Sequence, residues 1–283
     1  MKEIDLSTLI QADFSPHWRE GETAENYHST KEAVNSSSLK KILKSPNSFR
    51  AEFSQRFKRK ETDAMKFGTL VHTAILEGKD FQKRYAIMPD FGDQRTKINK
   101  DKKTAWLLEN EGKLHCSQED LDKTLYMIDS VLSHKDAVRL LKNGKTEISG
   151  YFADDETGIV QKIRPDFVSF DLDAEVDIKT TIDCTREAFT RSIWNYRYDF
   201  QRVMYRQGIK AITGKEVNFS AFIAVEKEPP YECAVYIADE GFMDRAWQDY
   251  RKSLDLLRDS IINNEWPSYQ QRLENISLPS WAF

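Results

Sequence analysis

The segment from Glu175 to Thr181 places the strongest constraint on how this chain folds. Its β-branched residues Val176 and Ile178 alternate with polar residues, which is the pattern of a short β-strand. Side chains alternate between the two faces of a strand, so Asp177 and Lys179 lie on the same face. A rigid strand therefore presents a carboxylate and an ammonium side by side, while its apolar residues point into a core.

A second carboxylate precedes this strand in the chain. Asp166 follows Pro165 at the end of a strand-like run from Ile159 to Arg164. Two acidic side chains from neighbouring strands, with Lys179 beside them, predict a site for a hard divalent cation, because oxygen ligands favour Mg²⁺ or Mn²⁺. An Asp-x-Lys sequence alone is more often a solvated strand edge, so the prediction also depends on the Pro-Asp pair and on the polar, aromatic helix that follows.

These residues resemble a known signature. Pro165-Asp166 followed by Asp177-Ile178-Lys179 resembles the PD-(D/E)XK nuclease motif, in the Asp-x-Lys form of RecB-like nucleases. Gln201 and Tyr205 lie one helical turn apart on a predicted helix. Together they resemble a third motif of that family, whose side chains line the active site, although ordinary surface residues also fit this spacing.

The resemblance is closest to the nuclease domain of RecE-type exonucleases (exonuclease VIII), and it runs from about Tyr27 to Trp281. The segment from Gly68 to His72 matches a helix whose histidine faces the metal site in that family. Taken alone, a histidine beside an apolar helix face is usually a core residue. Ser37, by its spacing to Pro46, matches a serine near the phosphate of the DNA end, and its alternative role is a helix cap.

The resemblance implies an α/β fold with a PD-(D/E)XK nuclease core, in which a central mixed β-sheet is flanked by helices and preceded by a helical N-terminal portion. We expect a single domain over residues 1–283. Its parts are an irregular N-terminal arm, a mostly helical part, and the sheet core with its flanking helices, at residues 1–30, 31–145 and 146–283.

Local patterns predict the individual elements. Three successive strands joined by tight turns, the third of them the Asp177 strand, indicate an antiparallel meander. The first two strands, and a later strand pair, are expected at residues 146–153, 159–168, 217–225 and 231–238. The main helices are expected at residues 67–76, 104–110, 117–141, 185–212 and 240–263.

A metal-dependent hydrolysis follows from the resemblance. The implied metal ligands are Asp177 as a bridging carboxylate, His72, Asp166 and the carbonyl of Ile178. Lys179 would orient or deprotonate the attacking water, and Gln201 and Tyr205 would complete the catalytic set. Mg²⁺ is the expected cofactor, and Mn²⁺ could substitute because histidine is an unusual ligand of Mg²⁺. The implied DNA contacts are Ser37, Arg164 and Thr180.

Some residues near the predicted site keep two roles open. Glu147 is either an outer carboxylate of the metal site or a plain strand-edge residue. Arg164 either pairs with a site carboxylate or contacts a phosphate. The basic run from Arg56 to Lys60 and the lysine-rich loop at residues 90–105 either hold DNA or are simply solvated.

Members of the resembled family degrade linear duplex DNA from the 5′ end and leave 3′ single strands in phage-type recombination. The resemblance therefore implies an exodeoxyribonuclease that acts on double-stranded DNA ends, with a single-strand annealing protein as a further partner and a homo-oligomeric ring, a trimer or tetramer. The alternatives are a Cas4-like single-strand nuclease or an endonuclease with the same site, and a non-catalytic DNA-binding module.

Composition restricts the remaining classes. The net charge of −4 excludes an evenly basic, DNA-coating surface but not a local basic channel. The three isolated cysteines do not form a disulfide framework, a zinc site or the four-cysteine set of an iron–sulfur cluster. Neither a signal-peptide pattern nor an apolar run of membrane-spanning length is found, so we expect a cytoplasmic protein that does not act in a membrane.

Overall fold

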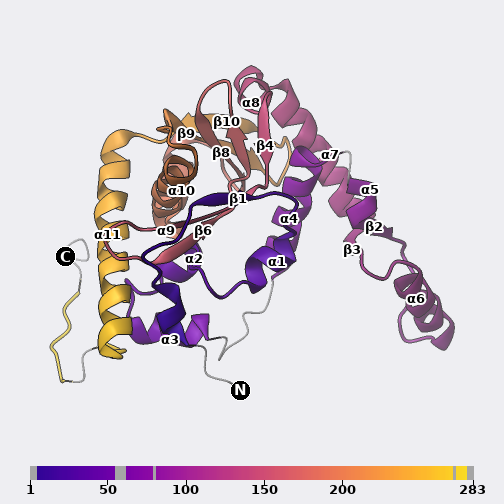
Figure 1. The fold of residues 1–283 in the computed structure, drawn as a ribbon. Coiled ribbons are helices and arrows are strands. Elements are labelled where there is room, and N and C mark those ends of the chain that lie inside the picture. The colour runs from indigo at the N-terminus through magenta and orange to yellow at the C-terminus, as the bar shows by residue number, and fades with distance from the viewer. Residues whose placement is uncertain (1–4, 55–61, 79–80, 270–271, 279–283) are drawn as a thin grey trace.

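The computed structural model describes residues 5–54, 62–78, 81–269 and 272–278 (Figure 1). The helices are η1, a 3₁₀ turn (Leu6–Leu9), α1 (Ala24–Ser29), α2 (Ser36–Leu39), α3 (Pro46–Phe53), α4 (Asp63–Leu76), α5 (Phe81–Arg84), α6 (Lys97–Glu109), α7 (Gln118–Ser133), α8 (Lys135–Leu140), α9 (Arg186–Tyr196), α10 (Tyr198–Thr213) and α11 (Glu240–Asn263). The strands are β1 (His17–Arg19), β2 (Tyr85–Met88), β3 (Leu114–Ser117), β4 (Gly144–Thr146), β5 (Ser149–Ala153), β6 (Val160–Ile163), β7 (Phe167–Ser169), β8 (Ala174–Thr181), β9 (Phe219–Glu226) and β10 (Cys233–Ile237).

The central sheet has the strand order β10-β9-β8-β7-β4. Strands β8 and β9 are parallel, and the other neighbours are antiparallel. The predicted mixed α/β fold, with helices on both sides of the sheet, is confirmed. The parallel pair requires a crossover, which α9 and α10 supply on one face of the sheet.

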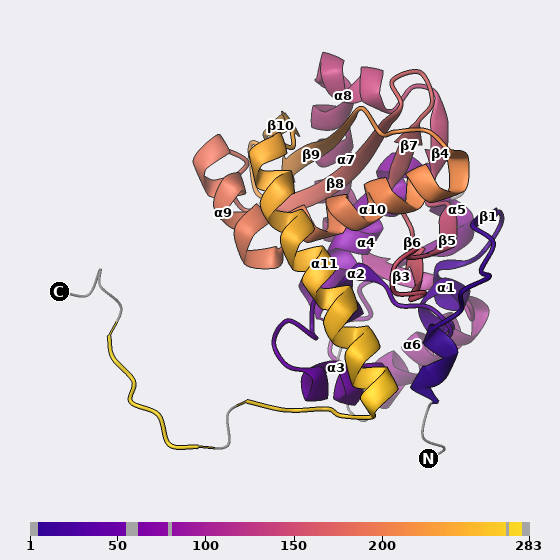
Figure 2. The ribbon, with the colours of Figure 1, turned by 60° about the vertical axis from the view of Figure 1, so that its left-hand side comes forward.

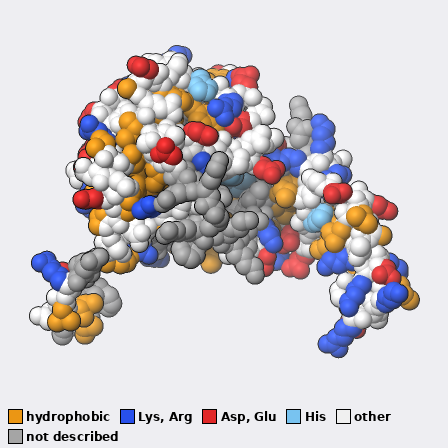
Figure 3. Space-filling model, turned by 60° about the horizontal axis from the view of Figure 1, so that its bottom comes forward, with side chains coloured by type: hydrophobic (Ala, Val, Ile, Leu, Met, Phe, Trp, Pro, Cys, Tyr) orange, Lys and Arg blue, Asp and Glu red, His pale blue; other side chains and the backbone are white. Residues whose placement is uncertain are grey.

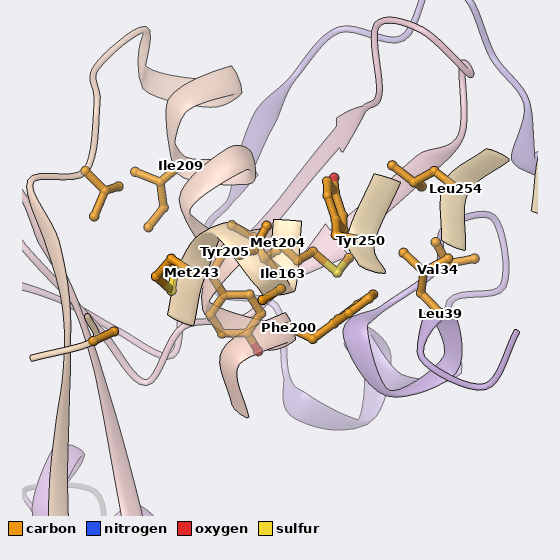
Figure 4. Close-up of a cluster of buried hydrophobic side chains, with 14 of the residues drawn as sticks. Val34, Leu39, Ile163, Phe200, Met204, Tyr205, Ile209, Met243, Tyr250 and Leu254 are labelled. Atoms are coloured by element: carbon orange, nitrogen blue, oxygen red, sulfur yellow. The ribbon is translucent and has the colours of Figure 1, made fainter. Parts of the chain in front are cut away.

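Two helical layers cover the sheet (Figures 1 and 2). Helices α4 and α7 pack on one face, where Val176 and Ile178 of β8 are fully buried. Helix α10 packs on the opposite face, and α11 packs against α10. Figure 4 shows Phe200 and Met204 of α10 beside Tyr250 of α11 in the larger core. Both faces of β8 are therefore buried, so polar side chains on it must find partners inside the protein.

Each of the first two predicted strands is divided between two sheets, so the predicted simple meander is wrong. Strands β5 and β6 pair with each other and with β1 in a second sheet, whereas β4 and β7 belong to the central sheet. Pro165 has no N–H to donate to a ladder, so the ladder stops there. Opposite this break, Glu147 adopts a left-handed backbone with φ 48°. Both strands turn from one sheet into the other at this corner.

The N-terminal segment is more ordered than an irregular arm. Strand β1 pairs with β5, with His17 opposite Tyr151. Leu9 is fully buried, and the hydroxyl of buried Tyr27 donates a hydrogen bond to the Lys162 carbonyl at 3.1 Å. These apolar residues have no helix or strand period because each enters a separate site on the body of the protein.

Two predicted helices are each divided in two. The helix expected at residues 185–212 ends at Arg197, whose left-handed backbone (φ 55°, ψ 49°) separates α9 from α10. The helix expected at residues 117–141 breaks at His134, whose side chain accepts a hydrogen bond from the Ala137 N–H and so caps α8. The helix expected at residues 240–263 is confirmed as α11.

A lobe formed by β2, β3 and α6 projects from the body (Figure 1). Helix α6 begins at Lys97, earlier than the predicted Thr104, because the Thr96 side chain caps it by accepting from the Asn99 N–H. It has no buried residue, and Figure 3 shows lysine and arginine side chains on this lobe. Arg95, Lys97, Lys100 and Lys102 are exposed.

The basic run from Arg56 to Lys60 and the C-terminal Trp281 lie outside the described residues. Among the helices of the described part, none combines the length and the apolar character needed to cross a lipid bilayer.

Candidate metal centre

Side chains from three parts of the chain meet at the corner between the two sheets. His72 comes from α4, where buried Leu70 and Val71 fix the orientation of the helix and leave His72 at the edge of its packed face. Glu147 and Asp166 occupy the two strand breaks, and the Glu147 N–H donates to the Asp166 carbonyl at 3.1 Å. The breaks that end the ladders therefore also place two carboxylates next to each other.

His72, Glu147 and Asp166 form a group that could hold a metal ion. One ligand atom from each lies within 4.8 Å of the others. His72 Nδ1 is 3.3 Å from Asp166 Oδ2, and the same oxygen accepts a hydrogen bond from the Ile178 N–H at 2.7 Å. Two carboxylates and one imidazole are a donor set that suits a divalent cation such as Mn²⁺ or Mg²⁺.

Their protonation states depend on one another. Burial and the Asp166 charge raise the pKa of Glu147 to about 7. Burial would raise the pKa of Asp166, but the His72 imidazole holds it well below its usual range. Burial opposes the charge on His72, yet Asp166 raises the pKa of its imidazole. A bound cation would have to displace protons from this group, because metal ligands bind in their deprotonated form.

Asp177 lies next to this group but is held by two cations. Its Oδ1 accepts a hydrogen bond from Arg202 Nη2 at 2.7 Å, and its Oδ2 lies 2.5 Å from Lys179 Nζ. The metal-ligand group among the described residues does not include it. The structure thus brings the predicted ligands His72 and Asp166 together with Glu147, and it places Asp177 against Lys179 and Arg202.

The Ile178 backbone connects the two sets. Its N–H points toward Asp166, and the N–H and C=O of one strand residue face the same neighbouring strand. Strand β7 pairs with β8 only as far as Val176, so the Ile178 carbonyl is beyond the ladder of that edge. This position is compatible with the predicted role of the carbonyl as a metal ligand.

Sequence reasoning missed two charged residues beneath the site. Arg202 of α10 and Glu175 of β8 are both fully buried and form an ion pair, while Arg202 also binds Asp177. Burial raises the pKa of Glu175 to about 8; the Asp177 charge adds to this rise and the Arg202 guanidinium opposes it. The sequence contained a signal for them. Glu175, Asp177 and Lys179 share one strand face, and two carboxylates with one lysine on a buried face need an additional cation.

Gln201 and Tyr205 lie together as predicted. The Gln201 Nε2 donates to the Tyr205 hydroxyl at 2.9 Å, and the Arg202 guanidinium lies 4.9 Å from the Tyr205 ring centroid. Burial raises the pKa of Tyr205, so its hydroxyl keeps its proton at neutral pH. The pair borders the buried charges beneath β8, with Tyr205 buried and Gln201 partly buried.

The three predicted DNA contacts differ in accessibility. Ser37 is exposed at the start of α2, and Thr180 is partly exposed beside Lys179. Arg164 is occupied: its Nε donates to Glu147 at 2.8 Å and its Nη1 donates to Ser149 at 2.7 Å. Of the two roles left open for Arg164, the structure shows the pairing with a site carboxylate, Glu147. A phosphate contact by Arg164 stays a prediction.

A groove of about 1200 Å³ opens onto the metal-ligand group. Its lining includes Glu147 of the metal-ligand group and Arg164, together with Arg84, Gly112 and Leu114 near β2 and β3. The groove therefore gives access to the candidate centre at Glu147.

Comparison with known proteins agrees with this architecture. The family model described as "PDDEXK-like domain of unknown function (DUF3799)" matches residues 35–279. No curated protein sequence is significantly similar to the chain.

Two solved structures resemble the chain. A candidate exonuclease from Eubacterium rectale is 14% identical, with a TM-score of 0.60, over 92% of this chain and 97% of that one. A phage related exonuclease from Haemophilus somnus 129PT is 14% identical over 82% of this chain and 96% of that one, with a TM-score of 0.37. At this identity, the first similarity is evidence for a shared fold.

Proposed function

Since the chain belongs to the family of PDDEXK-like domains, we propose that it is a metal-dependent nuclease that hydrolyses phosphodiester bonds in DNA. The observation that carries the proposal is the group formed by His72, Glu147 and Asp166 beside the Asp177–Lys179 pair. Acidic ligands next to a lysine, at the end of an open groove, match the needs of phosphate hydrolysis. A divalent cation bound there, Mg²⁺ or Mn²⁺, would polarise the phosphate and lower the pKa of a bound water.

The residues around the centre then have separate roles. The cation would be held by His72, Glu147, Asp166 and the Ile178 carbonyl. Asp177 would become a further ligand if its Oδ2, now paired with Lys179, turned toward the cation. Burial opposes the charge on Lys179, but Asp177 and Asp166 raise its pKa. Lys179 would therefore keep its proton, orient the attacking water and stabilise the charge on the phosphate, rather than act as a base.

Gln201 and Tyr205 act in this proposal from beneath the strand. Their hydrogen bond fixes the face of α10 that presents Arg202 to Asp177. They would position the carboxylate, while Ser37 and Thr180 at the surface would contact the DNA strand.

In finer detail, we propose a 5′→3′ exonuclease of double-stranded DNA that leaves 3′ single strands, as in phage-type recombination. Exposed cationic residues of α6 and the loop before it lie on the projecting lobe (Figure 3), and Gly112 and Leu114, which follow α6 in the chain, line the groove. Such a surface favours a polyanion, because each neutralised phosphate releases counterions. A cytoplasmic location, where chromosomal and phage DNA ends arise, suits this activity.

Assembly belongs to the same proposal. We propose that residues 1–283 act as one nuclease domain, because α10 packs against strands of both main sheets. A trimeric or tetrameric ring would keep the enzyme on a long duplex, and an annealing protein would receive the 3′ strand. Light scattering tests the ring: a monomer of about 33 kDa that still digests processively would contradict it.

The decisive experiment is digestion of an end-labelled linear duplex with Mg²⁺. We expect nucleotide release from the 5′-labelled strand, faster from a 5′-phosphate than from a 5′-hydroxyl end, and no cleavage of closed circular DNA. A variant with Glu147 replaced by Gln is the matched comparison, because it removes one ligand charge and keeps the side-chain size. Cleavage of circles would identify an endonuclease, and digestion of single strands alone would identify a Cas4-like activity. DNA binding without hydrolysis in Mg²⁺ or Mn²⁺ would leave a non-catalytic module.

A further inference from the structure

A second pocket, of about 230 Å³, is lined by Lys179 and shares no lining residue with the groove. The C-terminal end of β8 forms one wall, and the junction of α9 and α10 forms the other. Tyr196 and Tyr198, the residues on either side of this junction, both line the pocket, with Ser192 and Lys227 at its border. The pocket therefore joins two aromatic rings and a cation to the lysine of the candidate centre.

The two tyrosines are arranged as a stack. Their ring centroids are 5.6 Å apart with an interplanar angle of 23°. Lys179 Nζ lies 4.8 Å from the Tyr198 ring centroid, so the inner ring is in contact with the candidate centre. Tyr196 is 64% exposed. An exposed ring of this kind, stacked on a partly buried one, presents a flat apolar surface at the mouth of the pocket.

The junction that presents the rings is strained and firmly held. Arg197 adopts a left-handed backbone with φ 55°, which is uncommon for a residue other than glycine. Its guanidinium binds buried Asp199 at 3.0 Å and Asp249 of α11 at 2.7 Å. Lys40 of the N-terminal portion donates to the Tyr196 carbonyl at 3.1 Å. Asp199 nearby and two distant segments, at Asp249 and Lys40, thus fix a conformation that a continuous helix would avoid.

From this arrangement we propose that the pocket is a nucleobase subsite, in which Tyr196 and Tyr198 stack on a base of the strand whose phosphate lies at Lys179. The inference rests on the proposed nuclease function and adds its substrate contact. Stacking on an aromatic ring is tolerant of sequence because every base has a flat π-face, as a nuclease without a fixed recognition sequence requires. Lys227, whose N–H donates to the Thr181 carbonyl of β8 at 3.0 Å, also lines the pocket and would face the next phosphate.

The test measures base stacking separately from hydrolysis. The probe is a short duplex with 2-aminopurine as the 5′-terminal base, bound in Ca²⁺ to suppress cleavage, and compared with the same duplex lacking that base. We expect the wild type to quench the 2-aminopurine fluorescence and to bind the abasic duplex more weakly. Tyr196→Ala should weaken binding of the intact duplex by about 5- to 150-fold, and Tyr196→Phe should retain it.

Tyr126→Ala is the matched control. Tyr126 is also an exposed tyrosine, at 62%, stacked on Tyr231 with centroids 5.5 Å apart, but it lies on α7 across the sheet. This variant should bind both duplexes as the wild type does. The subsite is refuted if Tyr196→Ala binds the intact duplex normally, or if it loses equal affinity for the intact and the abasic duplex.

Failure of the subsite can be told apart from failure of the nuclease. If Tyr196→Ala still cleaves in Mg²⁺ with unchanged affinity, the nuclease stands and the subsite is wrong. If the wild type quenches 2-aminopurine in Ca²⁺ and never cleaves in Mg²⁺ or Mn²⁺, the subsite stands and hydrolysis is wrong.

Discussion

Replacing Arg202 by Met tests whether the buried charge cluster supports the whole site. The guanidinium is fully buried between Glu175 and Asp177, and methionine fills a similar volume without charge. The variant would leave the two carboxylates facing each other with only Lys179 as a cation. Removing one partner of a buried ion pair costs about 3–5 kcal/mol, because an uncompensated charge stays inside.

This free-energy cost predicts a measurable melting shift. The entropy of unfolding is about 2.1 cal/mol/K per residue, or about 0.6 kcal/mol/K for a chain of 283 residues. A loss of about 3–5 kcal/mol therefore lowers Tm by about 5–8 °C, measured by scanning calorimetry or circular dichroism without added metal. Arg206→Met is the matched control on the same helix. Arg206 binds the mostly exposed Glu240 at 3.2 Å and the Val217 carbonyl at 2.9 Å, so its loss should cost about 1–2 kcal/mol, clearly less than the loss of Arg202.

A second substitution examines the cause. In the Arg202→Met background, Glu175→Gln removes a buried acid whose pKa is already about 8 beside Arg202, so at pH 8 it should recover part of the lost Tm. The fall in Tm caused by Arg202→Met should also be smaller at pH 5 than at pH 8, because Glu175 carries a proton at pH 5. A fall in Tm of less than 2 °C, or no recovery with Glu175→Gln, would refute the view that Arg202 neutralises two buried carboxylates.

Three further outcomes are expected. Asp177→Asn keeps the hydrogen bond to Arg202 but removes the charge, so it should abolish Mg²⁺-dependent cleavage while a folded protein remains; substantial cleavage would remove Asp177 from the site. His72→Ala should weaken Mn²⁺ binding, measured by calorimetry, with little change in Tm, whereas a fall of about 1–3 kcal/mol in stability with normal activity would identify a core residue. Burial lowers the pKa of Lys162 to about 8, so the unfolded chain binds its proton more strongly between pH 8 and about 10.5. Stability should therefore rise with pH across that window, and Lys162→Met should remove the rise.

What could be predicted from the sequence depended on patterns that are local. Helix α11 was predicted with its observed bounds because its apolar residues recur at helical spacing between an Asp239 cap and its end at Asn263. The mixed α/β class followed in the same way from strand and helix periods and from the resemblance. The Asp177–Lys179 pair was found because strand alternation alone places both side chains on one face.

The breaks between helices could not be predicted, for two different reasons. The guanidinium of Arg197, whose backbone is left-handed, binds the distant Asp249 as well as the nearby Asp199. A tertiary contact thus accompanies a break where the local residues favour a continuous helix. His134 caps α8 through a local contact with the Ala137 N–H, but histidine in this role has no distinctive sequence signal.

Glu147 shows why the same limit applies to the candidate site. In sequence it begins a strand-like run, where a metal-site carboxylate and an ordinary edge residue look alike. Its left-handed backbone turns the chain from the central sheet into the β1-β5-β6 sheet, and its N–H binds the Asp166 carbonyl across the corner. The turn and the carboxylate pair therefore have one cause. Pro165 ends the ladder on one strand, so the opposite strand must bend as well, and the residue at that bend is brought to Asp166 and His72.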